Sequence, residues 1–319
     1  MRWRMVGLVT ILTVVLVGCS IPHQRDGDAS AKLAATRVQV ANLIDEYSAV
    51  RALGDERRDP SILRRVESGQ LLDIDSGVYF VSARVTPTEP LQPVRLTGPR
   101  TVVAPRFTRY PMWFAALADD EEAGTRRLAV FERADSLSPW LMTAAPELEG
   151  DSGLPGLEID GDGAAESVAA DDGDGLAFAP QAALDSYARA LSNNSAAERD
   201  LFDDDPFLQG TADFQQAQEN LPHASFAQSW SAQEVRHAVR LADGGALVVG
   251  TLSRSDEYEA ADDSYIDWTD NAAAKAYLPG RVFRSARLSF SHQVLLRVPP
   301  KGKARLLGQY GGVVDGQGS

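Results

Sequence analysis

Apolar positions recur at helical spacing in the first part of the chain that can fold. Between residues 31 and 53 one face of a predicted helix carries an apolar stripe with spacings of three and four residues: Leu33, Val40, Leu43, Ile44, Tyr47 and Val50. Gly54 is a natural end for this helix. A second, shorter helix follows, because Asp59 suits the N-cap, Pro60 suits the first turn and Gly69 suits the end. The pattern therefore predicts two helices before residue 71.

From residue 71 to residue 148 the apolar spacing becomes that of strands. We predict strands over 78–81, 101–109 and 140–145, and a hairpin formed by 112–117 and 128–131. The linker of this hairpin is acidic at its start and contains Gly124. Residues 31–148 are thus expected to form a first unit of helices and antiparallel strands.

The stretch 149–177 differs from its surroundings in composition. It holds many Gly and Asp residues and few large apolar ones. Such a composition cannot bury enough apolar surface to form a core of its own. It predicts a solvated acidic linker between two folded halves.

The order of elements then recurs in residues 178–319. A helix opens at Pro180, with Leu184, Tyr187 and Leu191 at helical spacing. Asp205-Pro206 repeats the helix start seen at Asp59-Pro60. Strands are predicted over 234–241, 246–252, 281–298 and 304–310, and a small helical piece near 272–277 follows an acidic insertion over 256–270.

This repeated order indicates the fold class. A helix laid across a curved antiparallel sheet is an α+β layer arrangement. The order of elements resembles that of the cone-shaped NTF2-like and cystatin-like folds. We therefore expect an α+β protein with two tandem units, 31–148 and 178–319, side by side.

The first 18 residues have the layout of an export signal. Arg2 and Arg4 supply a positive start, and the 14 residues from Met5 to Gly18 carry no charged side chain. This run is short of the roughly 20 apolar residues that a membrane-spanning helix needs. It ends in Leu16-Val17-Gly18-Cys19, which resembles the lipobox of bacterial lipoproteins. That resemblance implies cleavage before Cys19 and a diacylglycerol on its sulfur, with acyl chains such as palmitate; an ordinary signal peptide or an uncleaved anchor is the alternative.

Charge and cysteine content refine this picture. Cys19 is the only cysteine, so its lipidation would leave none for a disulfide. Without Arg2 and Arg4, 29 basic residues face 45 acidic ones, a formal charge of −16. Such a surface repels nucleic acid and anionic headgroups. We expect residues 19–30 to be a short polar tether, and the lipid to be the sole attachment to the extracytoplasmic face of the cell membrane.

A further resemblance covers most of the remaining chain. It rests on five segments in a fixed order: Asp59–Asp75, Met112–Phe114, Arg126–Phe131, Pro139–Leu141 and the Asp- and Gly-rich stretch at Ile159–Gly163. In that order they are similar to uncharacterised extracytoplasmic lipoproteins of actinobacteria, a family that carries a domain of unknown function. The resemblance implies a place in the cell envelope and a fold, with no activity attached.

The acidic linker invites comparison with a calcium-binding loop. Asp160 and Asp162 match the first and third positions of an EF-hand loop. Ala164 occupies the fifth position, glycine is absent from the sixth, and Asp171 replaces the bidentate glutamate. These mismatches favour a solvated linker, and we predict no metal site and no cofactor.

Candidate proton-transfer residues are few. His237 shares one face of the strand 234–241 with Val235 and Val239, which suits either a core histidine or a proton shuttle inside an NTF2-like cone. The other candidates are His292, Asp73 and Asp75. They come from different halves, and no spacing brings them together. The chain also lacks Gly-x-Ser-x-Gly, His-Glu-x-x-His and P-loop patterns, so we predict no catalytic set.

Two aromatic groups could line a groove for a sugar or a peptide. One is Tyr110–Phe114, and the other is Tyr258, Tyr265 and Trp268 in the acidic insertion. Core packing is the alternative for both groups. Aromatic side chains between carboxylates suit a contact with a partner.

These observations favour a non-enzymatic surface lipoprotein that binds a protein, a peptide or an envelope component. The alternative is a small-molecule hydrolase or isomerase with its site inside one cone. A third possibility is a structural assembly factor for an envelope complex.

Overall fold

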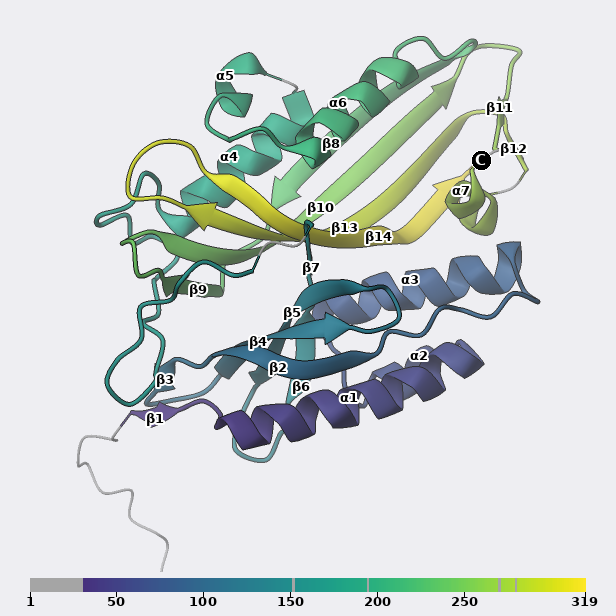
Figure 1. The fold of residues 1–319 in the computed structure, drawn as a ribbon. Helices are drawn as coiled ribbons and strands as arrows, with labels where there is room; N and C mark the ends of the chain where they lie inside the picture. The colour runs from purple at the N-terminus through teal and green to yellow at the C-terminus, as the bar shows by residue number, and fades with distance from the viewer. Residues whose placement is uncertain (1–30, 151–152, 194, 269–270, 279) are drawn as a thin grey trace, which may run out of the picture. The chain divides into compact units, whose positions relative to one another are not determined.

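A computed structural model describes residues 31–319 of the chain, apart from 151–152, 194, 269–270 and 279. The predicted export signal (1–18), Cys19 and the tether (19–30) therefore lie outside the described residues. Residues 31–319 group together as one unit. This unit is a mixed arrangement of several helices and a large antiparallel sheet (Figure 1).

The N-terminal half supplies three helices, α1 (Arg37–Arg57), α2 (Pro60–Leu63) and α3 (Gly69–Val85). A capping box starts α1, because the Thr36 hydroxyl accepts the backbone N–H of Gln39 and the Gln39 side chain accepts the backbone N–H of Thr36. Asp59 caps α2 as predicted, accepting the backbone N–H of Ser61 at 2.9 Å. Both predicted helices are present, but their bounds differ: Leu33 lies before α1, which runs past Gly54, and α2 ends at Leu63, whereas Gly69, the predicted end, begins α3.

Helix α3 was not predicted, and the strand predicted over 78–81 is wrong. The buried positions of α3 follow a helical period: Leu71, Ile74, Asp75, Gly77, Tyr79 and Ser82. Two of these, Asp75 and Ser82, are polar, so the apolar pattern alone hides the helical period. The neighbouring β-branched and aromatic run imitates a strand.

Antiparallel strands follow in the N-terminal half. They are β1 (Lys32–Leu33), β2 (Leu96–Val103), β3 (Arg106–Phe107), β4 (Met112–Asp120), β5 (Thr125–Arg133), β6 (Leu141–Ala144) and β7 (Glu147–Leu148). The predicted hairpin is confirmed, because β4 and β5 pair in continuous register from Met112↔Arg133 to Asp120↔Thr125. The predicted strands over 101–109 and 140–145 correspond in part to β2, β3 and β6.

The C-terminal half repeats helices followed by strands. Its helices are α4 (Pro180–Asn193), α5 (Ala196–Arg199), α6 (Pro206–Gln218) and α7 (Ala272–Tyr277). Its strands are β8 (Ala224–Ala232), β9 (His237–Arg240), β10 (Ala246–Ala260), β11 (Ile266–Asp267), β12 (Arg281–Val282), β13 (Ser285–Val298) and β14 (Arg305–Gly318). The helix at Pro180, the Asp205 cap of α6 and the strands β13 and β14 are confirmed, whereas β8 was not predicted.

Both halves contribute to one large sheet. Its strand order is β2-β4-β5-β7-β14-β13-β10-β8, with β6 beside β5 and β9 beside β10. The halves meet at the short strand β7, where Glu147 pairs with Arg127 of β5 and with Gln309 of β14. The division into units 31–148 and 178–319 stays a prediction.

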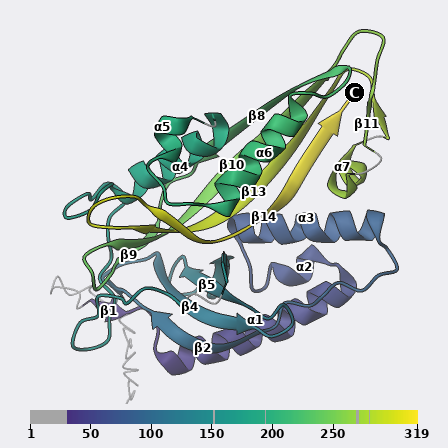
Figure 2. The same ribbon diagram turned by 45° about the horizontal axis from the view of Figure 1, so that its top comes forward.

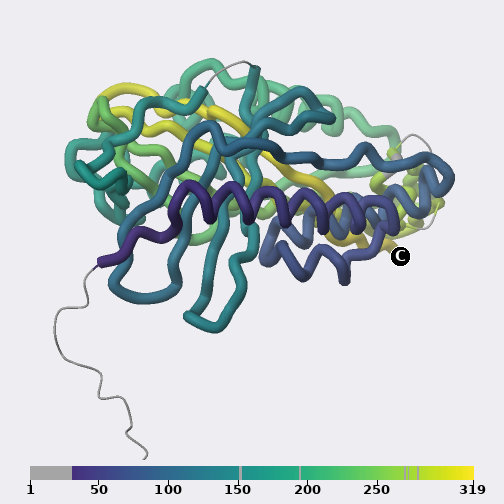
Figure 3. The backbone as a smooth tube through the Cα atoms, turned by 60° about the horizontal axis from the view of Figure 1, so that its bottom comes forward, coloured from purple at the N-terminus to yellow at the C-terminus, as the bar shows by residue number. Residues whose placement is uncertain are grey.

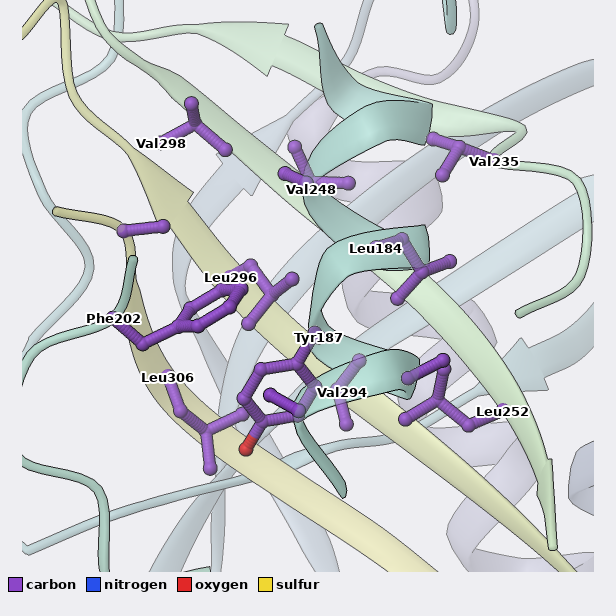
Figure 4. Packing of buried hydrophobic residues seen from close by; sticks show 14 of the residues in the cluster. Leu184, Tyr187, Phe202, Val235, Val248, Leu252, Val294, Leu296, Val298 and Leu306 are labelled. Atoms are coloured by element: carbon purple, nitrogen blue, oxygen red, sulfur yellow. The ribbon is translucent and has the colours of Figure 1, made fainter. Parts of the chain in front are cut away.

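Helices cover the C-terminal part of this sheet on opposite faces. α4 and α6 contact β8 on one face, and α3 contacts β13 and β14 on the other (Figures 1 and 2). The α4 side holds the apolar core drawn in Figure 4, in which Leu184 and Tyr187 of α4 pack against strand residues such as Leu252 and Val294. In the N-terminal half α1, which is drawn in purple in Figure 3, lies along β2.

The described residues of the acidic stretch 149–177, which leave out 151–152, are packed against the fold, where the sequence predicted a solvated connection. Its Ala164, Ala165 and Val168 side chains are buried. The backbone of Ala165 donates to Ala104, and that of Val168 donates to Ala238. Small apolar residues between the acidic ones therefore pack this stretch against both halves.

Candidate functional site

Three strands of the C-terminal sheet carry the same short pattern, a serine on each side of one large residue. The pattern is Ser229-Trp230-Ser231 in β8, Ser253-Arg254-Ser255 in β10 and Ser289-Phe290-Ser291 in β13. Side chains alternate between the faces of a strand, so the serines share one face and the large residues the other. One face of the sheet therefore carries hydroxyl groups, and the other carries aromatic rings and a guanidinium group.

The strand register brings the six serines into two rows. Ser253 pairs with Ser231 on one side and Ser291 on the other. Ser255 pairs with Ser229 and Ser289 in the same way. Residues that face each other across antiparallel strands have neighbouring side chains. The result is a grid of two rows of three hydroxyls.

Helix α3 turns this grid into a groove. Gln70 and Asp73 of α3 line a cavity of about 510 Å³ together with the six serines, Gln233 and Arg287. The Gln70 amide donates to Gln233 at 2.6 Å, and the Gln233 amide donates to the Ser253 hydroxyl at 3.2 Å. We call this cavity the serine groove. It joins α3 of the N-terminal half to strands of the C-terminal half.

Ser291 is the deepest hydroxyl of the serine groove. It is 6% exposed, and its Oγ has no hydrogen-bond partner among the described residues. Buried hydroxyls are ordinarily hydrogen-bonded, because desolvating one without a partner costs about 1–3 kcal/mol. An unpartnered hydroxyl at the wall of a cavity marks a position where a ligand can supply the missing bond.

The opposite face of the same strands is aromatic. The Arg254 guanidinium lies 4.2 Å from the ring centre of Phe290 and 5.5 Å from that of Trp230, and it pairs with the buried Asp256. The His292 ring packs 4.8 Å from Trp230. Burial and the charge of Arg254 lower the pKa of His292 from 6.5 to about 3. His292 is therefore a neutral member of a packed face at physiological pH.

His237, the other histidine of interest, lies in β9 against a carboxylate. Its Nε2 is 3.0 Å from Glu132 of β5, and its ring packs edge-on to Trp113 at 5.0 Å. Burial opposes ionisation of Glu132, but the hydrogen bond from His237 and the charge of Arg236 bring its pKa below the usual value. The structure does not bring the candidates His237, His292, Asp73 and Asp75 together, because each of them has different neighbours.

Asp73 and Asp75 have separate surroundings although both belong to α3. Asp73 is exposed at the rim of the serine groove. Asp75 is 1% exposed and pairs with Arg51 of α1. Residues two apart in an α-helix point to different sides, because only residues three or four apart share a face. Asp75 therefore belongs to a buried cluster that the pattern of residues along the chain does not indicate.

This buried cluster is centred on Arg51. Its guanidinium pairs with Asp55 at 2.8 Å, with Glu67 at 2.9 Å, and with Asp75. Three tyrosine hydroxyls complete it: Tyr47 donates to Glu67, Tyr79 donates to Asp55 and Tyr310 donates to Asp75. We call this group the Arg51 cluster. It ties α1, α3 and β14 together, and it thereby holds the wall of the serine groove in place.

Three carboxyl groups around one guanidinium cannot all ionise at low cost in a buried site. Burial and the nearby charge of Asp75 raise the pKa of Glu67 from 4.5 to about 8. The Glu67 Oε1 accepts from Tyr47 and Arg51, whereas Oε2 is buried without a partner among the residues described. Within this described part of the chain, one oxygen of the Glu67 carboxyl thus accepts two hydrogen bonds and the other accepts none.

The aromatic groups singled out from the sequence are mostly core residues. Trp113 and Phe114 are buried, and so are Tyr258 and Trp268. Tyr265 is exposed, next to the exposed ring of Phe283 and beneath the Arg281 guanidinium at 4.4 Å. The acidic insertion predicted over 256–270 is partly the end of β10, so it is not a separate surface loop; residues 269–270 lie outside the described part.

Two acidic residues that were compared with a calcium-binding loop form ion pairs with an arginine. Arg106 pairs with Asp160 at 3.0 Å and with Asp162 at 2.8 Å. Asp160 also accepts the backbone N–H groups of Asp162 and Ala164. Within the described ranges no group of three or more His, Cys, Asp or Glu side chains is arranged to hold a metal ion.

A larger cavity of about 840 Å³ lies at α5 and α6 and is lined by acidic residues. Two of its carboxylates, Asp203 and Asp204, face solvent, and the other two have protein partners. Asp200 accepts from Lys303 at 2.6 Å, and Asp205 caps α6 and accepts from the Tyr187 hydroxyl. The serine groove differs in having a buried polar atom that is still free to bond.

No helix in the described part of the chain combines the length and the apolar character needed to cross a membrane.

Fold and site together define a mixed α/β protein with one large antiparallel sheet and a hydroxyl-lined groove. Residues 31–318 match a family described as a domain of unknown function (DUF8094), and the chain belongs to this family. No match was found among curated proteins. None was found among solved structures.

Proposed function

We propose that the protein is an exported, lipid-anchored binding protein of the cell envelope and that the serine groove is its ligand site. The observation that carries this proposal is the unpartnered hydroxyl of Ser291, 6% exposed, at the wall of a cavity of about 510 Å³. A polar cavity with convergent hydrogen-bonding groups is the usual form of a ligand site. The groove offers hydroxyl and amide groups without a nucleophile and base in contact, which favours binding over catalysis.

The anchor rests on the N-terminal residues. Arg2 and Arg4, the apolar run and the Leu16-Val17-Gly18-Cys19 sequence support export and lipidation of Cys19. Two acyl chains hold a protein stably at a membrane where one does not. A Cys19→Ser variant should lose the lipid in mass spectra of the N-terminal peptide and should not fractionate with membranes. Normal processing and membrane retention of that variant would contradict the anchor.

Ligand binding can be tested with a variant that fills the groove. Full-length protein is extracted from membranes in mild detergent and mixed with envelope material separated into protein, lipid and carbohydrate fractions. A ligand that binds only the folded state raises the melting temperature. We expect one fraction to stabilise the wild type and not Ser255→Trp, whereas Ser136→Trp, at an exposed loop position, should behave as wild type. If no fraction distinguishes the groove variant, the proposal fails.

A second candidate function is proton-transfer catalysis by a small hydrolase or isomerase. The contact that favours it is the His237–Glu132 pair at 3.0 Å. A histidine oriented by a carboxylate is a common general base. The test is hydrolysis of chromogenic ester and amide substrates by the wild type and by His237→Gln. Equal rates for both proteins would remove this candidate.

We also propose that the two halves are related units of the NTF2-like or cystatin-like kind. In each half a long helix lies on antiparallel strands, and a following helix starts at an Asp-Pro pair whose aspartate accepts backbone N–H groups. This shared local design supports a common plan. An experimental structure whose halves do not superpose over helix and strands would contradict it.

A further inference from the structure

The chemistry of the serine groove restricts what it can hold. Its sheet side is made of six hydroxyls, and each hydroxyl both donates and accepts hydrogen bonds. Gln70 and Gln233 add amides that also offer both functions. A ligand that matches this surface needs many groups that donate and accept at once.

The charges around the groove cancel. Asp73 of α3 and Arg287 of β13 both line the cavity. The next cavity along the sheet, of about 430 Å³, is lined by Arg287 together with Glu257 and Glu259. Anionic ligands would meet these carboxylates without a matching set of cations. The groove therefore suits an uncharged ligand.

The groove also lacks the apolar pockets that peptides and lipids need. Peptides bound along a sheet obtain specificity from pockets for alternate side chains, and acyl chains need apolar walls. Because Trp230, Arg254 and Phe290 point to the other face, Val314 is the apolar side chain that remains among the residues lining this cavity. Neither peptide side chains nor acyl chains find a complementary wall.

The spacing of the grid favours a rigid polyhydroxylated ligand. Adjacent strands lie about 4.8 Å apart, and alternate residues of one strand are about 6.7 Å apart. The hydroxyls thus form a regular array rather than a single point of contact. A sugar ring carries its hydroxyls in fixed positions, so one residue of a glycan can bond to more than one serine, and a chain can follow the rows.

We infer that the serine groove binds a neutral carbohydrate chain, with Ser253 and Ser291 as its central contacts. This inference rests on the proposed function and names the ligand class of the same site. Ser291 supplies the buried hydroxyl that has no protein partner, and Ser253 is the hydroxyl already oriented by Gln233 and Gln70. A sugar hydroxyl that accepts from or donates to Ser291 completes its hydrogen bonding.

The test uses full-length protein in mild detergent on a printed array of neutral oligosaccharides, with uronic-acid and sulfated oligosaccharides beside them. The neutral oligosaccharide retained most strongly is then titrated by calorimetry. We expect the double variant Ser253→Ala/Ser291→Ala to bind it about 25-fold more weakly, since each lost hydrogen bond is worth about fivefold. Ser136→Ala is the matched control and should bind as wild type.

Retention of no neutral oligosaccharide, retention of acidic ones only, or unchanged affinity of the double variant each overturns the inference. The outcome is separable from that of the proposed function. If a protein or lipid fraction stabilises the wild type but not Ser255→Trp, the groove is a ligand site and only the carbohydrate assignment fails. If no fraction acts through the groove, both fail.

Discussion

The Arg51 cluster and the serine groove are two polar regions that share helix α3, and they differ in charge and in access to a cavity. In the Arg51 cluster one guanidinium meets three carboxyl groups, and three tyrosine hydroxyls donate to the same carboxyls. In the serine groove the hydroxyls carry no charge, and the deepest one has no partner in the described structure. Charge buried with its partners holds elements together, whereas neutral groups left open to a cavity are free to bind.

The two regions also differ in how much a substitution should lower the free energy of unfolding. Removing one member of a buried ion cluster leaves the others without compensation, and such losses are large. Removing a hydroxyl that bonds to nothing in the protein leaves no other group unsatisfied. Substitutions in the two regions should therefore change the free energy of unfolding to very different extents.

The largest effect is expected for Arg51→Met. The three carboxyls of Asp55, Glu67 and Asp75 would remain buried without a cation, so the free energy of unfolding should fall by about 3–5 kcal/mol. Urea unfolding followed by circular dichroism measures this change. Arg100→Met is the matched control, because Arg100 pairs with Asp119 at an exposed site, and such pairs contribute about 0–1 kcal/mol. A loss of under 1 kcal/mol for Arg51→Met would refute the assigned role.

The next effect concerns the pH dependence of stability. The folded protein holds the Glu67 proton up to the pKa of about 8, whereas an unfolded glutamate releases it near 4.5. The folded state thus binds more protons between these values, and its free energy of unfolding falls as pH rises from 4.5 to 8. One proton corresponds to a slope of at most about 1.4 kcal/mol per pH unit.

Glu67→Gln should remove this fall, because glutamine has no proton to lose. Urea unfolding of both proteins at pH 5, 6, 7 and 8 gives the comparison. The pH dependence of the wild type should then exceed that of Glu67→Gln over this range. Parallel curves for the two proteins would mean that Glu67 does not hold its proton in the folded state.

On the same strands, the serine face lines a cavity and the aromatic face is packed. A substitution of His292 tests how the packed aromatic face responds to pH. Its pKa of about 3 in the folded state lies below the usual 6.5, so the unfolded state binds more protons in between. Stability should therefore fall as pH drops from 6.5 toward 3. His292→Phe keeps a ring against Trp230 and Phe207 and should flatten the curve between pH 6.5 and 5. An unchanged acid limb would assign the loss to other groups.

The two polar regions were unequally predictable from the sequence. Helices with apolar stripes or cap residues, such as α2 at Asp59 and α6 at Asp205, follow local rules and were largely identified. Helix α3 was missed because its buried face includes the polar residues Asp75 and Ser82, and the burial of Asp75 depends on partners distant in the chain. The Arg51 cluster could not be predicted for the same reason: Tyr310 reaches Asp75 across 235 residues.

The serine groove did leave a signal in the sequence. The three patterns Ser-Trp-Ser, Ser-Arg-Ser and Ser-Phe-Ser are visible in the printed chain. What the chain does not display is the register that aligns them, since β8 pairs with β10 and β10 with β13 through non-local contacts. A search for polar alternation on neighbouring strands, in addition to apolar alternation, could have found this face.

The smallest effect on stability is expected for substitutions in the serine groove. In Ser253→Ala/Ser291→Ala the Ser291 change removes a buried hydroxyl that has no partner, which should be neutral or slightly stabilising. The Ser253 change leaves the Gln233 amide without one acceptor in a half-open site, where water can replace it. The net change in the free energy of unfolding should stay within about 0.5 kcal/mol. Urea unfolding of the ligand-free protein measures it. A loss above about 1 kcal/mol would show that the serine rows hold the sheet together as the Arg51 cluster holds the helices, and the distinction between a bonded cluster and an open ligand surface would no longer apply to this protein.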